Sequence, residues 1–418
     1  MDAKAYITKI GSAARAAAAE LALSTGAKRN AALLAAAAAI RDSRTAIQQA
    51  NERDVARSQK LGLAPAMIDR LRLSDKAVES MAKVMEQVAA QTDPVGSTIA
   101  AYNRPDGLRI EKRRVPIGVI GVIYESRPNV TADAAALCLK SANACILRGG
   151  KEAIDSNLAI AACLRKAVAS SGLPESAVTV IDDTDHAIVT AMAQAQGYID
   201  LIIPRGGEKL IRAVTESATV PTIKHYAGNC HVYVHSDADL AMAEEIVLNA
   251  KCQRPGVCNA AETLLVHKDV AGRFLPVIAQ NLRQAGVELR GDRQARDVVS
   301  DMQAATEKDW SEEYLDLILA VGVVDSLESA VAHINKYGSK HTDAIVTSSI
   351  AAAERFVIAV DSSSVMVNAS TRLSDGGEYG LGAEVGISTD KLHARGPMGA
   401  EDLTTYKWIV TGAGHVRK

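Results

Sequence analysis

An almost unbroken apolar run, Val115–Tyr124 (VPIGVIGVIY), is the feature that most limits what this chain can fold into. Apolar residues on both faces suit a central strand of a parallel sheet, because helices cover both sides of such a sheet. Similar runs follow at Ala144–Leu147, Val178–Ile181 and Tyr198–Ile203, and a helical pattern separates each from the next. Strands that alternate with helices predict a doubly wound parallel sheet over residues 115–218.

Two of these predicted strands end in a basic residue and paired glycines, Arg148-Gly149-Gly150-Lys151 and Arg205-Gly206-Gly207. In doubly wound sheets, ligands bind beyond the carboxyl ends of the strands. Glycines let a phosphate approach the backbone, and the following helix offers free N–H groups and its positive end. Neither copy has the G-x-G-x-x-G spacing, so two ordinary helix-entry turns are an equal alternative from the motif alone.

A second α/β pattern begins at His231 and presents a cysteine on a tight loop. Cys258 follows a predicted helix, Ala238–Asn249, and precedes a buried strand, Thr263–His267. Lys251 and Arg254 are close in sequence, and nearby positive charge favours a thiolate, the form that attacks carbonyl carbons. A small buried hydrophobic residue is the alternative, and the spacing alone slightly favours it.

The remaining segments predict a helical beginning and an antiparallel arm. Residues 3–91 have a helical pattern with breaks near Gly26, Gly62–Pro65 and Asp75. Asp106-Gly107 is a hairpin turn signal within Tyr102–Arg114. Such a hairpin is either a solvated ribbon or an arm that pairs with another subunit.

The composition excludes several classes of protein. The 47 lysines and arginines nearly balance the 49 acidic residues, so nothing attracts the whole chain to nucleic acid or to an anionic membrane. The first residues form an amphipathic pattern unlike a signal peptide, and the longest apolar run is too short to span a bilayer. Six scattered cysteines without a secretion signal indicate reduced thiols and a cytoplasmic location.

Several histidines and a cysteine lie close together in the sequence. Their spacing matches no structural zinc pattern, so we predict no metal there and expect activity to be insensitive to chelators. The residues are His225, Cys230, His231 and His235.

Several segments together resemble the gamma-glutamyl phosphate reductases, a branch of the aldehyde dehydrogenase superfamily. The resemblance extends from the first helices to the carboxyl terminus, and the block around Cys258 and the segment HARGPMG are its most specific parts. The matching segments are VPIGVIGVIYESRPNVT, ILRGGKEA, AKCQRPGVCNAAETLLV, VNASTRLSDGG and GLGAEVGISTDKLHARGPMG.

This resemblance implies a reaction: NADPH-dependent reduction of L-glutamyl 5-phosphate to L-glutamate 5-semialdehyde and phosphate, in proline biosynthesis. Cys258 takes the position of the nucleophile that forms a thioester. The tetrahedral oxyanion needs positioned donors, and the resemblance assigns them to the Cys258 backbone N–H and the Asn129 amide. Hydrolytic members use a glutamate base, but Lys224–His231 contains no carboxylate. We therefore expect little hydrolysis of the thioester.

The resemblance also assigns binding residues. Arg148 and Lys151 are expected near the adenosine ribose and its 2′-phosphate, Gly206 and Gly207 beside the pyrophosphate, and Glu313 at the nicotinamide ribose. A solvated acid pair is the alternative for Glu313. The candidates for the glutamyl carboxylate are Arg127 and Arg372, and Arg254 is expected to meet the leaving phosphate.

The implied fold is aldehyde dehydrogenase-like, with two doubly wound α/β domains and an oligomerisation arm. Residues 1–228 form the NADPH-binding domain with the hairpin 102–114, residues 229–361 the catalytic domain, and residues 362–418 the return to the cofactor domain and the oligomerisation strand. A homo-oligomer is expected, and the glutamate kinase that makes the substrate is a candidate partner. Two alternatives are a coenzyme A-acylating dehydrogenase and a non-catalytic nucleotide-binding protein with a buried Cys258.

Overall fold

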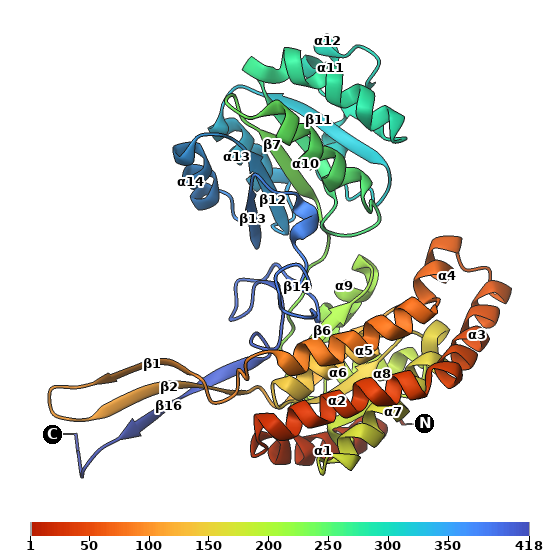
Figure 1. Ribbon diagram of the computed structural model, residues 1–418, viewed down its shortest axis with the longest axis vertical. Coiled ribbons are helices and arrows are strands. Elements are labelled where there is room, and N and C mark those ends of the chain that lie inside the picture. The colour runs from red at the N-terminus through yellow and green to blue at the C-terminus, as the bar shows by residue number, and fades with distance from the viewer. Residues whose placement is uncertain (1, 418) are drawn as a thin grey trace. The chain divides into compact units, whose positions relative to one another are not determined.

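The computed structural model describes residues 2–417, apart from the side chains of Pro65 and Ala66, and the chain divides into two compact units (Figure 1). The first, here the amino-terminal unit, contains the residues up to Lys224, Gly380–Gly386 and the segment from Pro397 onward. The second, here the central unit, contains His225–Tyr379 and Ile387–Gly396. Within the described residues, no helix combines the length and hydrophobicity needed to cross a membrane.

A series of helices opens the amino-terminal unit, as the sequence predicted. The side chains of Asp2, Thr25 and Ser74 accept hydrogen bonds from backbone N–H groups in the first turns of α1, α2 and α5. Such N-caps satisfy donors that have no partner inside the helix. The helices are α1 Ala3–Ala22, α2 Gly26–Asp42, α3 Arg44–Lys60, α4 Pro65–Leu71 and α5 Asp75–Ala90.

A parallel sheet in the order β5-β4-β3-β6 forms the centre of this unit. All residues of β3 are buried, as the apolar run predicted. The strands are β3 Val119–Tyr124, β4 Ala144–Arg148, β5 Val178–Val180 and β6 Leu201–Arg205, and the helices between and after them are α6 Asn129–Lys140, α7 Ile154–Ser170, α8 His186–Ala193 and α9 Glu208–Ser217. The order confirms a doubly wound sheet, whose topological switch point lies between β3 and β6.

The prediction of one strand over Val115–Tyr124 was wrong, because the chain turns at Gly118. Gly118 has a φ of 132°, and an added Cβ would lie 2.2 Å from Asp200 Oδ2. The same carboxylate accepts a hydrogen bond from the Val119 backbone N–H at 2.8 Å. Asp200 therefore fixes the start of β3, and the neighbouring strand β6 begins just after it, three residues later than predicted.

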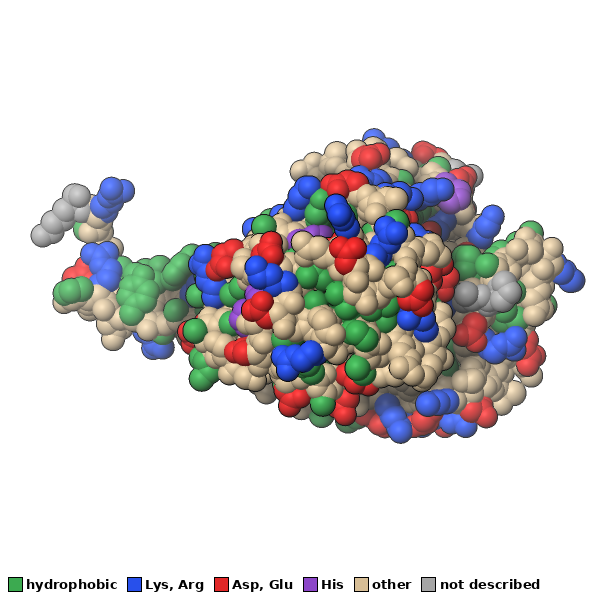
Figure 2. Space-filling view, turned by 90° about the horizontal axis from the view of Figure 1, so that it is seen from above, with side chains coloured by type: hydrophobic (Ala, Val, Ile, Leu, Met, Phe, Trp, Pro, Cys, Tyr) green, Lys and Arg blue, Asp and Glu red, His purple; other side chains and the backbone are tan. Residues whose placement is uncertain are grey.

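An antiparallel arm contains the predicted hairpin and the last strand of the chain. Its strands are β1 Thr98–Asn103, β2 Arg109–Pro116 and β16 Thr404–Thr411, in the order β1-β2-β16. Figure 2 shows hydrophobic side chains on the arm's surface, at the left of the view. The exposed ones include Tyr102, Tyr406, Trp408 and Val410.

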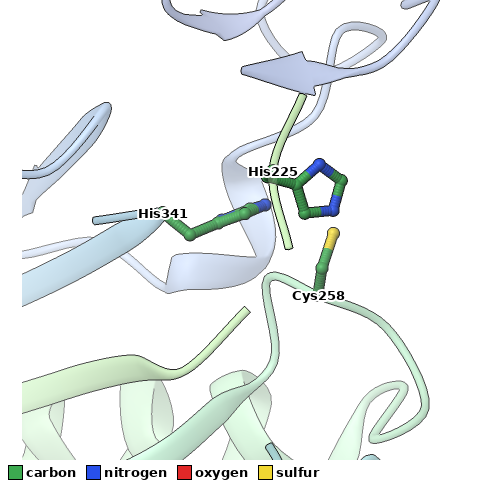
Figure 3. Close-up of side chains that lie close together, drawn as sticks. All are labelled: His225, Cys258 and His341. Atoms are coloured by element: carbon green, nitrogen blue, oxygen red, sulfur yellow. The ribbon is translucent and has the colours of Figure 1, made fainter. Parts of the chain in front are cut away.

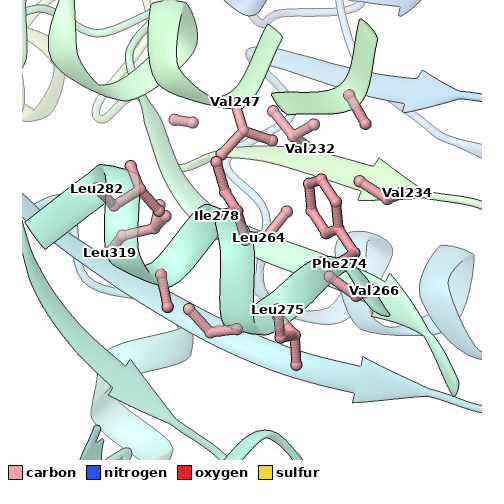
Figure 4. Close-up of a cluster of buried hydrophobic side chains, with 14 of the residues drawn as sticks. Val232, Val234, Val247, Leu264, Val266, Phe274, Leu275, Ile278, Leu282 and Leu319 are labelled. Carbon is pink, nitrogen blue, oxygen red and sulfur yellow. The ribbon is translucent and has the colours of Figure 1, made fainter. Parts of the chain in front are cut away.

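The central unit is a second parallel sheet, in the order β10-β9-β11-β8-β7-β12-β13. The strands are β7 Cys230–Val234, β8 Ala261–His267, β9 Glu288–Gly291, β10 Gln303–Ala304, β11 Ile318–Val324, β12 Thr342–Val346 and β13 Ser364–Val367, and the helices are α10 Leu240–Cys252, α11 Lys268–Gln284, α12 Arg293–Val298, α13 Leu327–Tyr337 and α14 Ile350–Ala359. Figure 4 shows side chains of α10 and α11 packed on the sheet, including Val247 and Phe274. This core fixes the strand ends around which the candidate site is built.

Two features of the central unit differ from the sequence-based description. Strands β9 and β10 were not predicted, because β10 has only two residues and β9 contains no continuous apolar run. The predicted return to the first domain at residue 362 precedes the observed one at Gly380. The reason is that Ser364–Val367 pairs with Thr342–Ile345 and so extends the central sheet.

Candidate active site

The loop that carries Cys258 is held at both ends by a buried ion pair. Lys251 lies in the last turn of α10 and Glu262 in β8, and Lys251 Nζ lies 2.6 Å from Glu262 Oε2. Both side chains are fully buried. Burial raises the pKa of the Glu262 carboxyl to about 7, while the Lys251 ammonium acts in the opposite direction. The pair fixes the distance that residues 253–260 must span.

This pairing changes the role that the sequence suggested for Lys251. Its charge is neutralised by Glu262, so it is not the cation that favours a Cys258 thiolate. Cys258 itself is only half-buried, whereas Cys230 is fully buried and burial raises the pKa of the Cys230 thiol. The alternative that Cys258 is a packed core residue is therefore excluded.

Arg372 braces the same loop from the segment after β13. Its Nη1 donates to Asn259 Oδ1, and its Nε donates to Gln253 Oε1 at 2.9 Å. Burial lowers the pKa of Arg372, and the charge of Arg254 acts in the same direction, while that of Cys258 opposes it. Arg254 and Arg372, both candidates for substrate binding, therefore lie close enough to Cys258 for their charges to interact. Arg372 also holds the loop in place.

The backbone before β7 packs directly against Cys258. An added Cβ on Gly228 would lie 1.8 Å from the Cys258 carbonyl oxygen, so only glycine fits there. Gly228 N–H donates to Glu313 Oε1 at 2.7 Å, and Cys230 Sγ donates to the Cys258 carbonyl at 3.2 Å. Glu313, predicted at the nicotinamide ribose, thus contacts the segment that packs against the Cys258 loop.

Two histidines accompany the Cys258 sulfur (Figure 3). One ligand-type atom from each of His225, Cys258 and His341 lies within 4.8 Å of the others. His225 Nδ1 lies 2.9 Å from the Ile387 carbonyl oxygen, which only accepts hydrogen bonds. Nδ1 therefore carries the proton in the neutral ring, and Nε2 has a lone pair that faces the sulfur.

The histidine group considered from the sequence is divided differently in the structure. His231 Nδ1 bonds Asp343 Oδ1 at 2.9 Å, and His235 Nδ1 bonds the Tyr233 hydroxyl at 2.8 Å. The sequence analysis missed His341 altogether. A signal was present: His225, Cys258 and His341 each precede a buried apolar strand (β7, β8 and β12), and the amino ends of parallel strands lie at one edge of a sheet.

In the amino-terminal unit, the candidate residues lie at the switch point between β3 and β6. Gly207 N–H, at the start of α9, donates to Glu125 Oε2 at 2.9 Å. An added Cβ on Gly206 would lie 2.4 Å from the same oxygen and 2.8 Å from Leu210 Cδ2. This helix N-terminus thus receives a carboxylate at the place where the sequence predicted a pyrophosphate.

Asn129 is the first residue of α6 and has a fixed side chain. Its Nδ2 donates to Asp133 Oδ2 at 2.8 Å. Burial raises the pKa of the Asp133 carboxyl to about 7, and the Asn129 hydrogen bond opposes this shift. The Arg127 side chain lies in the loop before α6 and is half-buried.

Arg148 ends β4, the strand next to β3, and is largely buried. Its Nη2 donates to the Thr184 carbonyl at 2.9 Å, and burial lowers its pKa. Lys151 is exposed. The predicted site residues therefore form two groups. One lies at the carboxyl ends of strands in the amino-terminal unit, and the other, in the central unit, precedes strands, apart from Arg372, which follows β13.

Comparison with known proteins adds a family to this geometry. The model of the aldehyde dehydrogenase family matches residues 2–316. The chain is 54% identical over 391 residues to the gamma-glutamyl phosphate reductase of Moorella thermoacetica, with 94% of each chain covered. It is 53% identical over 412 residues to the protein of that name from Geotalea daltonii, with 99% of each chain covered. The crystal structure of gamma-glutamyl phosphate reductase from Thermotoga maritima matches with a TM-score of 0.96 at 46% identity, over 99% of this chain and 100% of that one.

Proposed function

The chain belongs to the aldehyde dehydrogenase family and is an oxidoreductase, and on this premise we propose that it reduces L-glutamyl 5-phosphate to L-glutamate 5-semialdehyde and phosphate with NADPH. The names of its relatives support the substrate. The observation that carries the proposal is the half-buried Cys258, held on a braced loop with an imidazole nitrogen facing its sulfur. The product belongs to proline biosynthesis.

In the proposed reaction, the Cys258 thiol loses its proton and the sulfur attacks the acyl carbon. His225 presents Nε2 to the sulfur and is placed to accept that proton. Phosphate leaves with the bonding electrons of the C–O bond, and a thioester forms on the sulfur. Cys258 and Asn129 N–H groups would stabilise the oxyanion, which accounts for about 10²–10³ in rate for each donor.

The chain must bind NADPH, and the switch point of the amino-terminal unit fits this ligand. Gly207 N–H already holds the Glu125 carboxylate, so an anionic group suits that donor. Arg148 and Lys151 bring positive charge to the neighbouring strand end, where the 2′-phosphate is proposed. Bound NADPH supplies the hydride that reduces the thioester, and departure of the aldehyde frees the Cys258 sulfur.

The central unit supplies the remaining binding groups. Glu313 is proposed at the nicotinamide ribose, in addition to its hydrogen bond to Gly228 N–H. Arg254 is exposed and suits the leaving phosphate. Arg127 and Arg372 are proposed for the glutamyl carboxylate, and the bonds of Arg372 to the loop would couple substrate binding to the position of Cys258.

The surroundings of the enzyme are also proposed. All six cysteines are free, which suits the reducing cytoplasm. The exposed aromatic side chains of the arm favour a homo-oligomer. A kinase that makes the acyl phosphate is the natural partner, because this substrate is reactive.

The test is the reverse reaction of the purified protein. Glutamate semialdehyde and NADP are expected to yield NADPH only when phosphate is present. Coenzyme A in place of phosphate should not support the reaction, nor should simple aldehydes replace the substrate. Cys258→Ala should lower turnover by at least about 10³-fold, whereas Cys252→Ala, six residues away, should leave it within about twofold. Activity that depends on coenzyme A, or that survives Cys258→Ala, would overturn the proposal.

A further inference from the structure

We propose that His225, Cys258 and His341 form a binding site for a borderline or soft metal cation, Zn²⁺ first among them, that reversibly blocks the sulfur. The claim that the metal inhibits the reaction rests on the proposed function, whereas the claim that the metal binds does not. The site includes His225, one of the four residues for which the sequence analysis predicted no metal, and adds Cys258 and His341 to it. The metal is inhibitory, so the reaction requires none.

The distances suit a cation after a small adjustment. Zn–N and Zn–S bonds of about 2.0 and 2.3 Å in a tetrahedron place ligand atoms about 3.3–3.6 Å apart. The three atoms already lie within 4.8 Å of one another. Figure 3 shows the His225 ring and the Cys258 sulfur facing each other, so metal binding would only need to draw these atoms closer together.

The types of ligand select the metal. Imidazole nitrogens and a thiolate suit Zn²⁺, Cd²⁺ and copper, whereas Mg²⁺ and Ca²⁺ require oxygen ligands. The group contains no carboxylate. Three protein ligands leave the fourth tetrahedral position for water or for a substrate oxygen.

Two neighbouring groups orient the imidazoles. The Ile387 carbonyl holds His225 with Nε2 toward the sulfur. His341 Nδ1 lies 2.9 Å from Thr342 Oγ1, which fixes the plane of that fully buried ring. Partners of this kind orient histidine ligands in metal sites, and losing one typically costs 10–100-fold in affinity.

Metal binding would use the same sulfur atom that the proposed reaction needs. Binding replaces the thiol proton, which passes to solvent, by a metal–sulfur bond. Because the same electron pair of sulfur cannot then attack an acyl group, the metal inhibits and a chelator restores activity.

The experiment titrates the full-length, chelator-treated protein with Cd²⁺ and follows the thiolate-to-metal absorption band, with Zn²⁺ as competitor. One equivalent is expected to bind. Cys258→Ala should abolish the band, and His225→Asn and His341→Asn should each weaken binding at least about tenfold. Cys252→Ala and His186→Asn, which change a half-buried cysteine and an exposed histidine outside the group, should bind as the unchanged protein does.

A band that persists in Cys258→Ala, or an affinity unchanged in His225→Asn, would show an adventitious ion only and would overturn the proposal. His341 is buried, so thermal unfolding verifies that its variant is folded; if it is not, His225→Asn decides. The binding signal needs no substrate. Loss of phosphate-dependent activity with an intact band would reject the proposed function alone, whereas activity without the band would reject the metal site alone.

Discussion

In the amino-terminal unit the candidate site residues follow the strands of a parallel sheet, whereas in the central unit all of them except Arg372 precede strands. Glu125, Arg148 and Gly206 lie at carboxyl ends of strands, while Cys258 and His341 lie at amino ends. Helices begin at the first kind of edge and end at the second. The first edge therefore offers backbone N–H groups to an anion, whereas at the second edge the helices end in backbone carbonyl groups.

This difference explains why side chains dominate the central site. The loop with Cys258 follows the carboxyl end of α10, which offers no backbone N–H donors, so its position depends on specific side-chain contacts. Lys251 and Glu262 tie the loop ends, Arg372 braces the middle, and His225 faces the sulfur. The amino-terminal site depends more on backbone donors and on space left by glycine.

The largest expected effect is a loss of stability when the buried Lys251–Glu262 ion pair of the central unit is broken. Lys251→Met leaves the Glu262 carboxyl buried without its partner, and such a loss typically costs about 3–5 kcal/mol. Urea unfolding at neutral pH measures it. Lys268→Met, which breaks an exposed pair with Asp325, should cost less than about 1 kcal/mol. Equal losses would mean that the buried pair does not anchor the loop.

The second prediction compares close packing at the two edges. Gly228→Ala drives a methyl group into the Cys258 carbonyl and should lower kcat/KM by at least about 10²-fold through displacement of the sulfur. Gly207→Ala is the matched variant, since its Cβ meets only Glu125 Oε2, at 4.0 Å. Steady-state kinetics with both variants is the measurement. A Gly228→Ala enzyme of normal activity contradicts the contact.

The third prediction separates bracing from substrate binding by Arg372. Arg372→Lys keeps the charge but loses the planar fork that reaches both Gln253 and Asn259. Bracing predicts a fall in kcat of about tenfold and a changed rate of Cys258 alkylation without substrate. Arg254→Lys serves as the control, with an effect on KM alone. An unchanged alkylation rate would leave substrate binding as the sole role of Arg372.

The fourth prediction concerns pH and the amino-terminal unit. The folded-state pKa of Asp133, about 7, is above its ordinary 3.8. The folded protein therefore holds a proton that the unfolded chain releases, so this contribution to stability is complete below about pH 4 and is lost as pH rises through 7. The contribution to the free energy of unfolding is on the order of 2 kcal/mol. This is smaller than the pKa shift alone implies, because the Asp133 side chain is partly exposed and solvent screens its charge.

Asp133→Asn keeps the side chain neutral at every pH. Unfolding free energies at pH 4.5 and 7.5 should thus show a smaller fall with pH in the variant than in the unchanged protein. Asp297→Asn, at an exposed position of the central unit, is the control and should retain the original slope. If both variants behave alike, Asp133 is ionised at neutral pH.

The smallest expected effect is on the affinity for NADPH and concerns the Gly207 N–H group at the start of α9, which Glu125 occupies. Glu125→Gln removes the charge that occupies Gly207 N–H and should lower the Kd for NADPH about two- to fivefold, the usual scale of charge effects at a helix end. Fluorescence titration measures it. Glu216→Gln, at the other end of α9, should leave the Kd unchanged. Weaker binding by Glu125→Gln would place the pyrophosphate elsewhere.

Local sequence determined the frame of this protein. Continuous apolar runs identify buried strands, and the alternation of strands and helices predicts parallel sheets. Strands β3, β7 and β8 and the loop with Cys258 were therefore predictable. Strand β9 was not, because its four residues, Glu288–Gly291, contain no continuous apolar run.

Tertiary structure decided which side chains meet. Lys251 was read as a neighbour of Cys258, yet it points to Glu262, and His341 was unnoticed although it lies beside the sulfur. Such pairings join residues that are 11 and 83 positions apart, and they depend on sheet order and on the direction of each side chain. Periodicity along the chain reports whether a residue is buried, but only the packed sheet determines what it is buried against.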